Sequence, residues 1–530
     1  MMKRKIPKPE GPGARLLDPR AYMLALGSGL LLILSFPKFG VGLTAWISLL
    51  PLLYALRGKN SLQGLLLGVT AGFTAHIGIM YWITCVVVEY GYLPYPVGIA
   101  AMLLLSLYLS VYTGLFAALL VFSRRRGLPF WVAAPVLWVV LEYGKSQLLT
   151  GFPWENLGYS QYLYLPVIQI ADVAGVYGVS FLIVFVNAIL YELFFVATEK
   201  RSKAARIIAV LAVPALVCTY GVFRLQELET SVKTAPSLTA RIAQGNIDQS
   251  VKWDPRYQRE TIAAYADLSA PAPAAGSDRP ELIVWPETAF PSFFQDINDL
   301  HRDVAGLARS AASWLLFGSP AYTYRGGELV LFNSAFLLAP DGTIAGRYDK
   351  VHLVPYGEYV PWRRFFPFIN KLVAGIGDFG VGPGYHPLSL SDRRLGVLIC
   401  YEGIFPEAAR DYKRGGAEFL INITNDAWFG RTSAPYQHLS MTVFRAVENR
   451  LDVIRAANTG ISALIDATGR IGERKELFQR GRLDVKIHFY GRDTFYATHG
   501  DLLVYLSFTA IIIYLLTINI RRFGHVGRNR

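Results

Sequence analysis

The sequence predicts two kinds of structure in one chain, a multi-pass α-helical membrane domain and a globular α/β domain. Of the 530 residues, 53% are hydrophobic and only 17% are charged, which is too apolar for an ordinary soluble multidomain protein. Long apolar runs fill the chain up to residue 225 and return after residue 500, whereas the region between them has a mixed composition. We therefore expect a transmembrane domain in 1–225, a globular domain in 226–500, and a last span with a basic tail in 501–530.

Eight apolar segments are candidate membrane spans. The hydrocarbon core of a bilayer is about 30 Å thick, so a crossing helix needs about 20 predominantly apolar residues. The first two segments are short and are separated by the turn Pro37-Lys38-Phe39-Gly40. The candidate spans are 21–37, 41–56, 62–88, 96–123, 129–149, 177–198, 205–225 and 501–520.

Clusters of lysine and arginine predict the orientation of these spans, because short basic loops stay on the cytoplasmic side. With a cytoplasmic N-terminus, all the clusters fall on that side, and 226–500 lies outside, which in a bacterium is the periplasmic face of the inner membrane. The first span is alternatively a signal peptide, but its apolar run begins late, near Ala21. The clusters are Lys3-Arg4-Lys5, Arg57 with Lys59, Arg124-Arg125-Arg126, Lys200 to Arg206, and Arg521-Arg522.

The charge and the cysteines argue against several classes of protein. The formal net charge is +13, but the basic residues gather beside the apolar runs, so we do not expect nucleic-acid binding. Cys85 and Cys218 lie in apolar runs and Cys400 lies in the globular region, so no disulfide framework is expected. The sequence has no metal-ligand spacing of Cys, His and carboxylates and no G-x-x-x-x-G-K-[ST] phosphate loop. We expect neither a metal nor a cofactor.

The globular region alternates short β-type runs with helical stretches, which predicts α/β layers. Asp341-Gly342 and Thr468-Gly469 resemble hairpin turns, so a mixed sheet is favoured over a purely parallel one. The predicted strand runs are RIAQGNI, ELIVWPET, WLLFGSPAY, NSAFLLAPDG, RLGVLICYE, AEFLINITND and ISALIDATG.

Glu287, Lys350 and Cys400 stand at the ends of such runs, where side chains of a sheet converge on one crevice. Taken singly, a glutamate after Trp-Pro is often a helix cap, a lysine is usually solvated and a cysteine after Leu-Ile usually belongs to the core. Together they match the needs of a thiol nucleophile, which requires a proton acceptor and a group that stabilises the oxyanion. An ion pair between Glu287 and Lys350 would give thiolate character to a cysteine far from a helix N-terminus.

Histidine is the usual partner of a catalytic cysteine, and it offers an alternative reading of the same region. The globular region contains only scattered histidines, such as His352 and His438. A Cys-His dyad therefore stays open but is less favoured than the Glu, Lys and Cys set.

The ordered Glu, Lys and Cys with their flanking residues resemble the nitrilase, or carbon-nitrogen hydrolase, superfamily. Further motifs, together with the spans, resemble the bacterial apolipoprotein N-acyltransferase family over nearly the whole chain. These motifs are GFPWENLGYSQ at 151–161, QGN at 244–246, WPE at 285–287, KxHLVPxGEYVP at 350–361, CYExxFPE at 400–407, NITNDAWFG at 422–430, RAxExR at 445–450 and ANTGIS at 457–462.

This resemblance implies an αββα sandwich and transfer of an acyl chain from a phospholipid, usually phosphatidylethanolamine, to the α-amino group of a lipoprotein's diacylglyceryl-cysteine. By position, Cys400 would take the acyl group as a thioester, Glu287 would be the general base, and Lys350 would stabilise the oxyanion. The backbone N–H of Tyr401 would add a second donor. The cycle would be ping-pong, with the lysophospholipid leaving before the amine attacks.

The resemblance also implies supporting residues around the triad, which are Trp253, Glu358, Tyr401 and Glu402. Glu358 follows Lys350 by eight residues, so a loop would let its carboxylate orient the lysine. Its alternative is a surface carboxylate, and Trp253 alone would more often be a core residue. Asn333 and Asn425 are further candidates for hydrogen bonds to the backbone around the pocket.

The segment 360–380 is rich in Phe, Trp and Gly and carries Arg363 and Arg364. Since both substrates are lipid-anchored, we expect either a mobile flap that dips into the headgroup region or an ordinary packed loop.

Two other functions compete with acyl transfer. A membrane-tethered amidase or nitrilase would use the same Glu287, Lys350 and Cys400 with water as the second nucleophile. A transporter or scaffold with an inactive domain would suit a chain that lacked one of the three, and all three are present.

Overall fold

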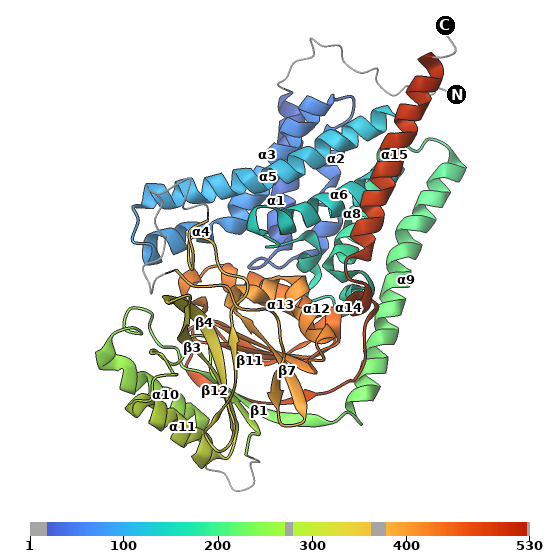
Figure 1. Ribbon diagram of the computed structural model, residues 1–530. Helices are drawn as coiled ribbons and strands as arrows, with labels where there is room; N and C mark the ends of the chain where they lie inside the picture. The colour runs from blue at the N-terminus through green and yellow to red at the C-terminus, as the bar shows by residue number, and fades with distance from the viewer. Residues whose placement is uncertain (1–17, 271–278, 362–377, 527–530) are drawn as a thin grey trace. The chain divides into compact units, whose positions relative to one another are not determined.

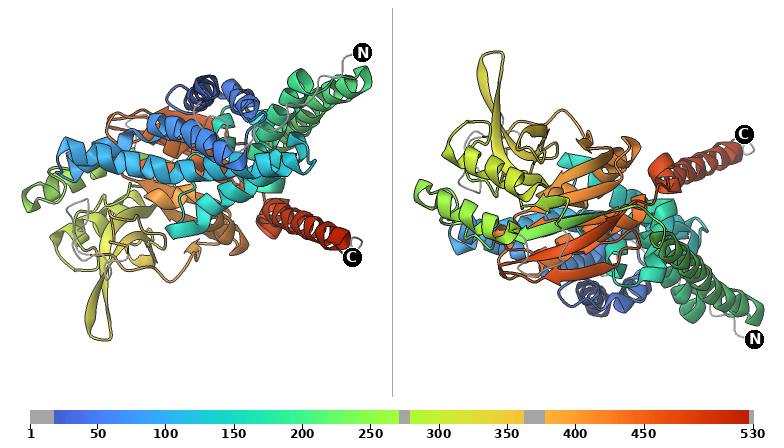
Figure 2. Two further views of the ribbon diagram at one scale, coloured as in Figure 1. Left: turned by 90° about the horizontal axis from the view of Figure 1, so that it is seen from above. Right: turned by 90° about the horizontal axis from the view of Figure 1, so that it is seen from below.

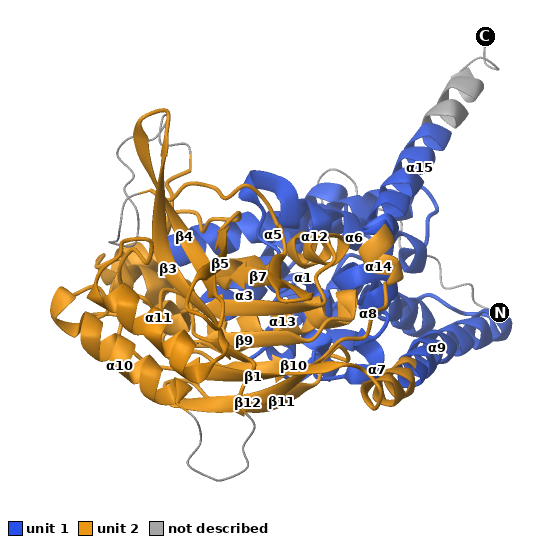
Figure 3. Ribbon diagram, turned by 60° about the horizontal axis from the view of Figure 1, so that its bottom comes forward, with its two compact units in different colours: residues 1–81, 100–223, 499–530 blue, residues 82–99, 224–498 orange. Residues whose placement is uncertain are grey.

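The computed structural model describes residues 18–270, 279–361 and 378–526, and the side chains of 18–270, 279–361 and 378–518. Contacts divide the chain into two compact units (Figure 3). Unit 1 comprises residues up to 81, 100–223 and from 499, and unit 2 comprises 82–99 and 224–498.

Unit 1 is helical, and each predicted apolar segment contains helix. By length and composition, four helices are long and apolar enough to cross a membrane, so the count of eight spans stays a prediction. The predicted segment 41–56 is broken, because a 3-10 turn at Gly42–Trp46 precedes the short helix α2, Leu50–Ala55, which has Pro51 in its first turn. The other helices are α1 Pro19–Ser35, α3 Ser61–Met80, α5 Tyr95–Arg125, α6 Phe130–Gln147, α7 Leu165–Ile168, α8 Ala171–Phe195, α9 Lys200–Val232 and α15 Leu502–Val526, with 3-10 turns at Leu148–Thr150 and Leu157–Gln161.

Small residues let α3 and α5 pack closely. α3 begins with a capping box, in which the Asn60 side chain accepts a hydrogen bond from Gln63 N and Gln63 returns one to the Asn60 backbone. A Cβ atom on Gly68 would lie 2.5 Å from the carbonyl oxygen of Thr113, and one on Gly72 would lie 2.8 Å from Thr113 Oγ1. Glycine at these positions therefore lets the two backbones approach, as is typical of helix pairs in membranes.

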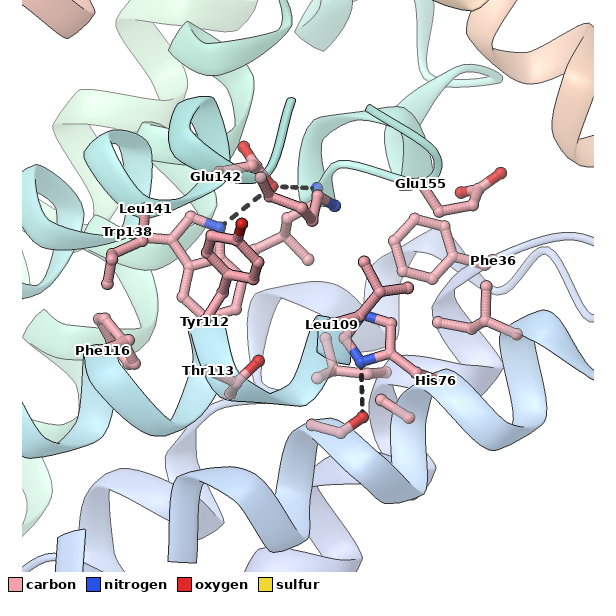
Figure 4. Close-up of a pocket in the computed structure, with 16 residues that line it drawn as sticks. Phe36, His76, Leu109, Tyr112, Thr113, Phe116, Trp138, Leu141, Glu142 and Glu155 are labelled. Carbon is pink, nitrogen blue, oxygen red and sulfur yellow. Dashed lines mark hydrogen bonds between the residues drawn. The ribbon is translucent and has the colours of Figure 1, made fainter. Parts of the chain in front are cut away.

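A cavity with a mainly apolar lining and a few buried polar side chains lies within unit 1, between α1, α3, α5 and α6 (Figure 4). Glu142 on α6 accepts hydrogen bonds from Trp138 Nε1 at 3.2 Å and from Leu157 N at 2.7 Å. Lys145 Nζ donates to the carbonyl oxygen of Trp154 at 3.2 Å. These buried groups of α6 hold the GFPWENLGYSQ motif as an ordered loop.

Unit 2 contains two six-stranded mixed sheets. The first has the strand order β12-β1-β2-β3-β4-β5, in which β1, β2 and β3 are parallel and the remaining pairs are antiparallel. A turn at Asp341-Gly342 joins β4 to β5, as predicted. The strands are β1 Ser237–Gln244, β2 Leu282–Val284, β3 Trp314–Arg325, β4 Glu328–Leu338, β5 Ile344–Asp349 and β12 Gly481–His488.

The second sheet has the order β11-β10-β9-β8-β7-β6, with β7, β8 and β9 parallel. The predicted turn at Thr468-Gly469 joins the antiparallel strands β10 and β11. All seven predicted strand runs contain a strand, and β5, β6, β9, β11 and β12 were not predicted. The strands are β6 Leu388–Leu390, β7 Arg393–Ile399, β8 Phe419–Thr424, β9 Val453–Ala457, β10 Ser462–Ile465 and β11 Ile471–Lys475.

Helices cover both outer faces of the paired sheets, so the predicted αββα sandwich is confirmed (Figure 1). Helices α10, Gln258–Ser269, and α11, Asp299–Ala311, pack on the first sheet through a core that includes Tyr265, Trp285 and Phe317. Helices α12, Pro406–Arg414, and α13, Ala434–Asn449, pack on β7 and β9 of the second. The β3–β4 hairpin projects from the sandwich (Figure 2).

The segment 82–99 belongs to unit 2, although the predicted third span extended to residue 88. Trp82 Nε1 donates to Gln437 Oε1 at 3.0 Å, and the Trp82 ring lies edge-on to Phe429, with centroids 5.1 Å apart. The helix α3 ends at Met80, and a short helix, Trp82–Cys85, and a π-helical turn, Val86–Tyr90, follow it. The end of the third apolar run thus packs against the loop that follows β8.

Candidate active site

Cys400 lies at the point where β7 ends and a 3-10 turn, Cys400–Ile404, begins. Its φ angle is +52°, in the left-handed region that costs a non-glycine residue of the order of 1–3 kcal/mol. The turn leads directly into α12. The expectation that Cys400 lies far from any helix start is therefore wrong, because the chain turns sharply from strand to helix at this residue.

Glu287 follows β2 and is buried between the two sheets, with 7% of its surface exposed. Its Oε1 accepts a hydrogen bond from Asn333 Nδ2 at 2.8 Å, and its Oε2 accepts one from the backbone N–H of Asn425 at 2.9 Å. Burial raises the pKa of Glu287, although the ammonium group of Lys350 opposes this shift. The side chains of Asn333 and Asn425 were expected to bond backbone around the pocket. The Asn333 side chain instead bonds this carboxylate, and the Asn425 side chain donates to Gln249 Oε1 at 2.7 Å and accepts from Asn458 Nδ2 at 3.1 Å.

Lys350 follows β5, and its Nζ lies 2.9 Å from Oε2 of Glu358. Burial alone would lower the pKa of Lys350, but the carboxylates of Glu358 and Glu287 hold it above its ordinary value. Glu358 also accepts a hydrogen bond from Val354 N at 2.8 Å, so the loop folds back on the lysine as expected. The expected ion pair of Lys350 with Glu287 was wrong, because within the described residues Glu358 takes that place.

The thiol of Cys400 interacts electrostatically with Glu287 and with Lys350. Burial raises its pKa, the Glu287 carboxylate raises it further, and Lys350 opposes the shift. The resting group is therefore a neutral thiol beside a carboxylate, and not the preformed thiolate that the sequence suggested.

Glu402 links the Cys400 turn to the chain that follows Lys350. Its Oε1 accepts hydrogen bonds from Tyr348 Oη at 2.7 Å, Val351 N at 2.8 Å and His352 N at 3.1 Å. Its Oε2 accepts one from Ile399 N at 2.7 Å. Burial raises the pKa of Glu402 to about 7, although Lys350 and these donors oppose the shift.

The two aromatic residues of the predicted set differ in burial. The Tyr401 ring is buried against Phe405, with ring centroids 5.0 Å apart. Trp253 is 37% exposed, so it is not a core residue. The roles of both residues stay predictions.

Lys252 was not singled out from the sequence, although it precedes Trp253. It is buried, and its Nζ donates to the Glu287 carbonyl oxygen at 3.2 Å and to Thr288 Oγ1. Burial lowers its pKa to about 8, while Glu287 and Cys400 oppose the shift. A second ammonium group therefore lies beside the backbone of Glu287. The sequence did not indicate this, because no sequence pattern distinguishes a loop lysine whose side chain is buried.

The histidine alternative finds no support in this geometry. His438 Nε2 lies 3.1 Å from the carbonyl oxygen of Cys400, which is a contact with the backbone. The His352 ring stacks on Phe405, with centroids 3.6 Å apart. Most of the predicted 360–380 flap lies outside the described residues. Within the described part of the chain, no three His, Cys, Asp or Glu residues are placed to hold a metal ion.

Comparisons with known proteins match both units of the chain. The model of the apolipoprotein N-acyltransferase N-terminal domain matches residues 28–189, and the carbon-nitrogen hydrolase model matches residues 239–492. The apolipoprotein N-acyltransferase of Geobacter metallireducens is 48% identical over 92% of this chain and 94% of its own length. The chain belongs to the apolipoprotein N-acyltransferase family.

A second relative agrees with this family assignment, and two solved structures show a weaker likeness. The enzyme of the same name from Pasteurella multocida is 31% identical over 96% of both chains. A carbon-nitrogen hydrolase from Helicobacter pylori G27 is 21% identical and covers 47% of this chain and 88% of its own, with a TM-score of 0.35. An amidase from Nesterenkonia sp. is 22% identical over 47% of this chain and 90% of its own, also with a TM-score of 0.35.

As an apolipoprotein N-acyltransferase, the protein is a membrane enzyme with a nitrilase-superfamily domain. Membership of this family favours acyl transfer over the amidase and over an inactive scaffold.

Proposed function

We propose that this enzyme transfers a fatty acyl chain from a phospholipid, with phosphatidylethanolamine as the expected donor, to the N-terminal S-diacylglyceryl-cysteine of lipoproteins. The observation that carries this proposal is the setting of Cys400. A thiol on a strained strand-to-helix turn shares its electrostatic surroundings with a buried carboxylate, Glu287, and a buried ammonium group, Lys350. That arrangement supplies a nucleophile, a proton acceptor and a cation for an oxyanion.

In the first half-reaction, Glu287 removes the thiol proton of Cys400 as the sulfur attacks the ester carbonyl of the phospholipid. The carbonyl oxygen becomes an oxyanion, which Lys350 and the backbone N–H of Tyr401 stabilise. When the tetrahedral intermediate collapses, the ester C–O bond breaks and Glu287 returns the proton to the departing lysophospholipid. An acyl thioester on Cys400 remains.

In the second half-reaction, the α-amino group of the lipoprotein attacks the thioester carbonyl as a neutral amine. Glu287 accepts a proton from the attacking nitrogen, the C–S bond breaks, and the proton passes to the departing Cys400 sulfur. The raised pKa of Glu287 suits a group that must both take and return a proton near neutral pH. The amide product leaves, and the resting thiol is restored.

We further propose the domain boundaries 1–225, 226–500 and 501–530, with the catalytic domain on the periplasmic face of the bacterial inner membrane. The positions of the basic clusters support this orientation. Trp253, Glu358, Tyr401 and Glu402 are proposed as supporting residues. Glu358 would hold Lys350, and Glu402 would hold the turn that carries Cys400, through the contacts described above.

The proposal is tested by incubating the purified full chain with phosphatidylethanolamine and measuring the intact mass of the protein. We expect an added acyl mass that localises to the Cys400 peptide, is removed by hydroxylamine, and passes to the amine of a diacylated lipopeptide. The Cys400→Ala variant should gain no such mass. Absence of phospholipid-derived acylation, with release of ammonia from small amides, would instead establish the amidase function.

A further inference from the structure

The peptide bond between Cys400 and Tyr401 is held at its carbonyl end by two side chains. The carbonyl oxygen of Cys400 lies 3.1 Å from His438 Nε2 and accepts a hydrogen bond from Asn422 Nδ2 at 3.3 Å. A carbonyl oxygen can only accept hydrogen bonds, so the hydrogen of the His438 contact must be on Nε2. Both donors are buried, with 1% of His438 and none of Asn422 exposed.

His438 is itself fixed by a buried ion pair on the far side of its ring. Its Nδ1 lies 3.1 Å from Asp426 Oδ1 and 3.1 Å from the Arg455 guanidinium. Arg455 pairs with Asp426 at 2.7 Å, and the side chains of both are fully buried. In the neutral ring with its hydrogen on Nε2, Nδ1 accepts from Arg455. Nδ1 donates to Asp426 only in the doubly protonated ring, which also keeps the hydrogen on Nε2.

Charges in this network are stable near neutral pH. Burial would raise the pKa of Asp426, but Arg455 and His438 hold it at about 2, so the carboxylate stays ionised. Burial and Arg455 lower the pKa of His438. The surroundings are also tight, because a Cβ atom on Gly460 would lie 2.3 Å from Asp426 Oδ2. This contact gives a physical reason for the glycine in the ANTGIS motif.

The orientation of this peptide bond matters because a trans peptide unit is planar, and its N–H and C=O groups point in opposite directions. A network that fixes the direction of the Cys400 carbonyl therefore fixes the direction of the Tyr401 N–H. The positive φ of Cys400 is a conformation that a non-glycine residue keeps only when its surroundings impose it. The hydrogen bonds from His438 and Asn422 supply such a constraint.

We propose that His438, held by Asp426 and Arg455, is a positioning residue that aims the backbone N–H of Tyr401 at the oxyanion formed on Cys400. This inference rests on the proposed function, because it assigns a task within the acylation step. His438 acts through the peptide bond, so it neither removes the thiol proton nor contacts the substrate.

Two substitutions of His438 by an amide residue test its two ring nitrogens, Nε2 and Nδ1, separately. The amide nitrogen of Gln in His438→Gln can reach the place of Nε2 and keep a donor for the Cys400 carbonyl. The shorter His438→Asn can meet Asp426 and Arg455 at the place of Nδ1 but does not reach that carbonyl. The two variants have similar polarity, so a difference between them does not arise from loss of a polar side chain.

Each variant of the full chain in detergent is measured with two reagents that attack the same sulfur. Acylation by phosphatidylethanolamine passes through an oxyanion, whereas alkylation by iodoacetamide displaces iodide and forms none. We expect His438→Asn to lower the rate of acylation about 100-fold, the scale of losing one oxyanion donor. The rate of alkylation should change by less than about threefold. His438→Gln should be acylated at least about tenfold faster than His438→Asn, a difference of ~1.4 kcal/mol in activation free energy.

Three results would overturn the inference, and a fourth would refute the proposed function. A parallel fall of acylation and alkylation would place His438 at the thiol, as in a Cys-His dyad. The positioning role would be wrong if a folded His438→Asn variant were acylated as fast as the wild type. It would also be wrong if His438→Asn and His438→Gln were acylated at the same rate. A wild-type protein that is alkylated at Cys400 but never acylated by phospholipid would instead refute the proposed function.

Discussion

Among the described residues, Lys350 pairs with Glu358, at 2.9 Å, and not with Glu287. The amide nitrogen of Asn333 donates to both carboxylates at 2.8 Å and so separates the two acidic groups. The carboxylate of Glu358 therefore pairs with the ammonium group of Lys350. The other, Glu287, stays available to exchange a proton with Cys400, so the two acids have different tasks within one buried cluster.

The Glu358→Gln substitution should impair both activity and stability. It leaves the ammonium group of Lys350 without its paired charge, and breaking a buried pair costs about 3–5 kcal/mol. Because Glu358 raises the pKa of Lys350 and burial lowers it, the lysine should lose its proton at lower pH in the variant. The alkaline limb of the pH profile of kcat/KM should therefore move to lower pH.

The matched control is Glu418→Gln, which removes the acidic partner of Arg393 in a partly exposed pair. Such pairs contribute about 0–1 kcal/mol, so this control should melt and react nearly as the wild type does. A Glu358→Gln variant with an unchanged alkaline limb would show that Glu358 does not set the charge of Lys350.

The acidic limb of the same pH profile should report Glu287. A general base works only when it is ionised, so activity is lost as the pH falls through its pKa. Burial raises that pKa, so the limb should lie above the value of about 4.3 for an unperturbed glutamate. Steady-state rates from pH 4 to 9 test this, with Glu287→Gln as the inactive reference; a limb at or below that unperturbed value would contradict the buried base.

Much of the architecture follows from local patterns in the sequence. Apolar runs predicted the helical unit, and alternating strand runs predicted α/β layers with a mixed sheet, whereas the αββα sandwich was implied by the family resemblance. Glu287 and Cys400 were recognisable because each follows a buried apolar strand, whereas Lys350 follows β5, which is mostly exposed or half-buried. The edge strand β11, which reads IGERK, was missed because most of its side chains are exposed and carry no apolar alternation.

Contacts between residues distant in sequence could not be predicted in this way. His438 meets the carbonyl of Cys400 across 38 positions of the chain, and Asn425 meets Glu287 across 138. Lys252 turns inward from a loop, where a lysine is normally solvated. The partner of Lys350 was also misassigned, since which of two carboxylates reaches an ammonium group depends on how the loop folds.

Gly318 of β3 should tolerate no side chain. A Cβ atom there would lie 2.4 Å from the backbone nitrogen of Thr288 and 2.7 Å from the Cα of Glu287. The Gly318→Ala variant should therefore displace Glu287, lower the acylation rate at least about tenfold, and cost about 1–3 kcal/mol of stability. In the control Gly306→Ala, on α11, the nearest atom would be 3.8 Å away, and we expect near wild-type activity and melting. Equal activity of the two variants would contradict this packing.

The Glu402→Gln substitution should disturb the Cys400 turn more than its small chemical change suggests. At pH 8, above the pKa of about 7, both oxygens of the carboxylate accept from donors, so an amide NH₂ would face another N–H group. If the amide nitrogen replaces Oε2 it opposes Ile399 N, and if it replaces Oε1 it opposes Val351 N and His352 N. Leaving such a buried donor unsatisfied costs about 1–3 kcal/mol.

We expect Glu402→Gln to lower both the melting temperature and the rate of acylation at pH 8. The matched control is Tyr348→Phe, which removes one donor to Glu402 and introduces no opposed N–H group. Its melting temperature should fall less than that of Glu402→Gln, because the carboxylate keeps its three backbone donors. Similar losses in the two variants would mean that the hydroxyl of Tyr348, and not the backbone amides, determines how Glu402 holds the turn.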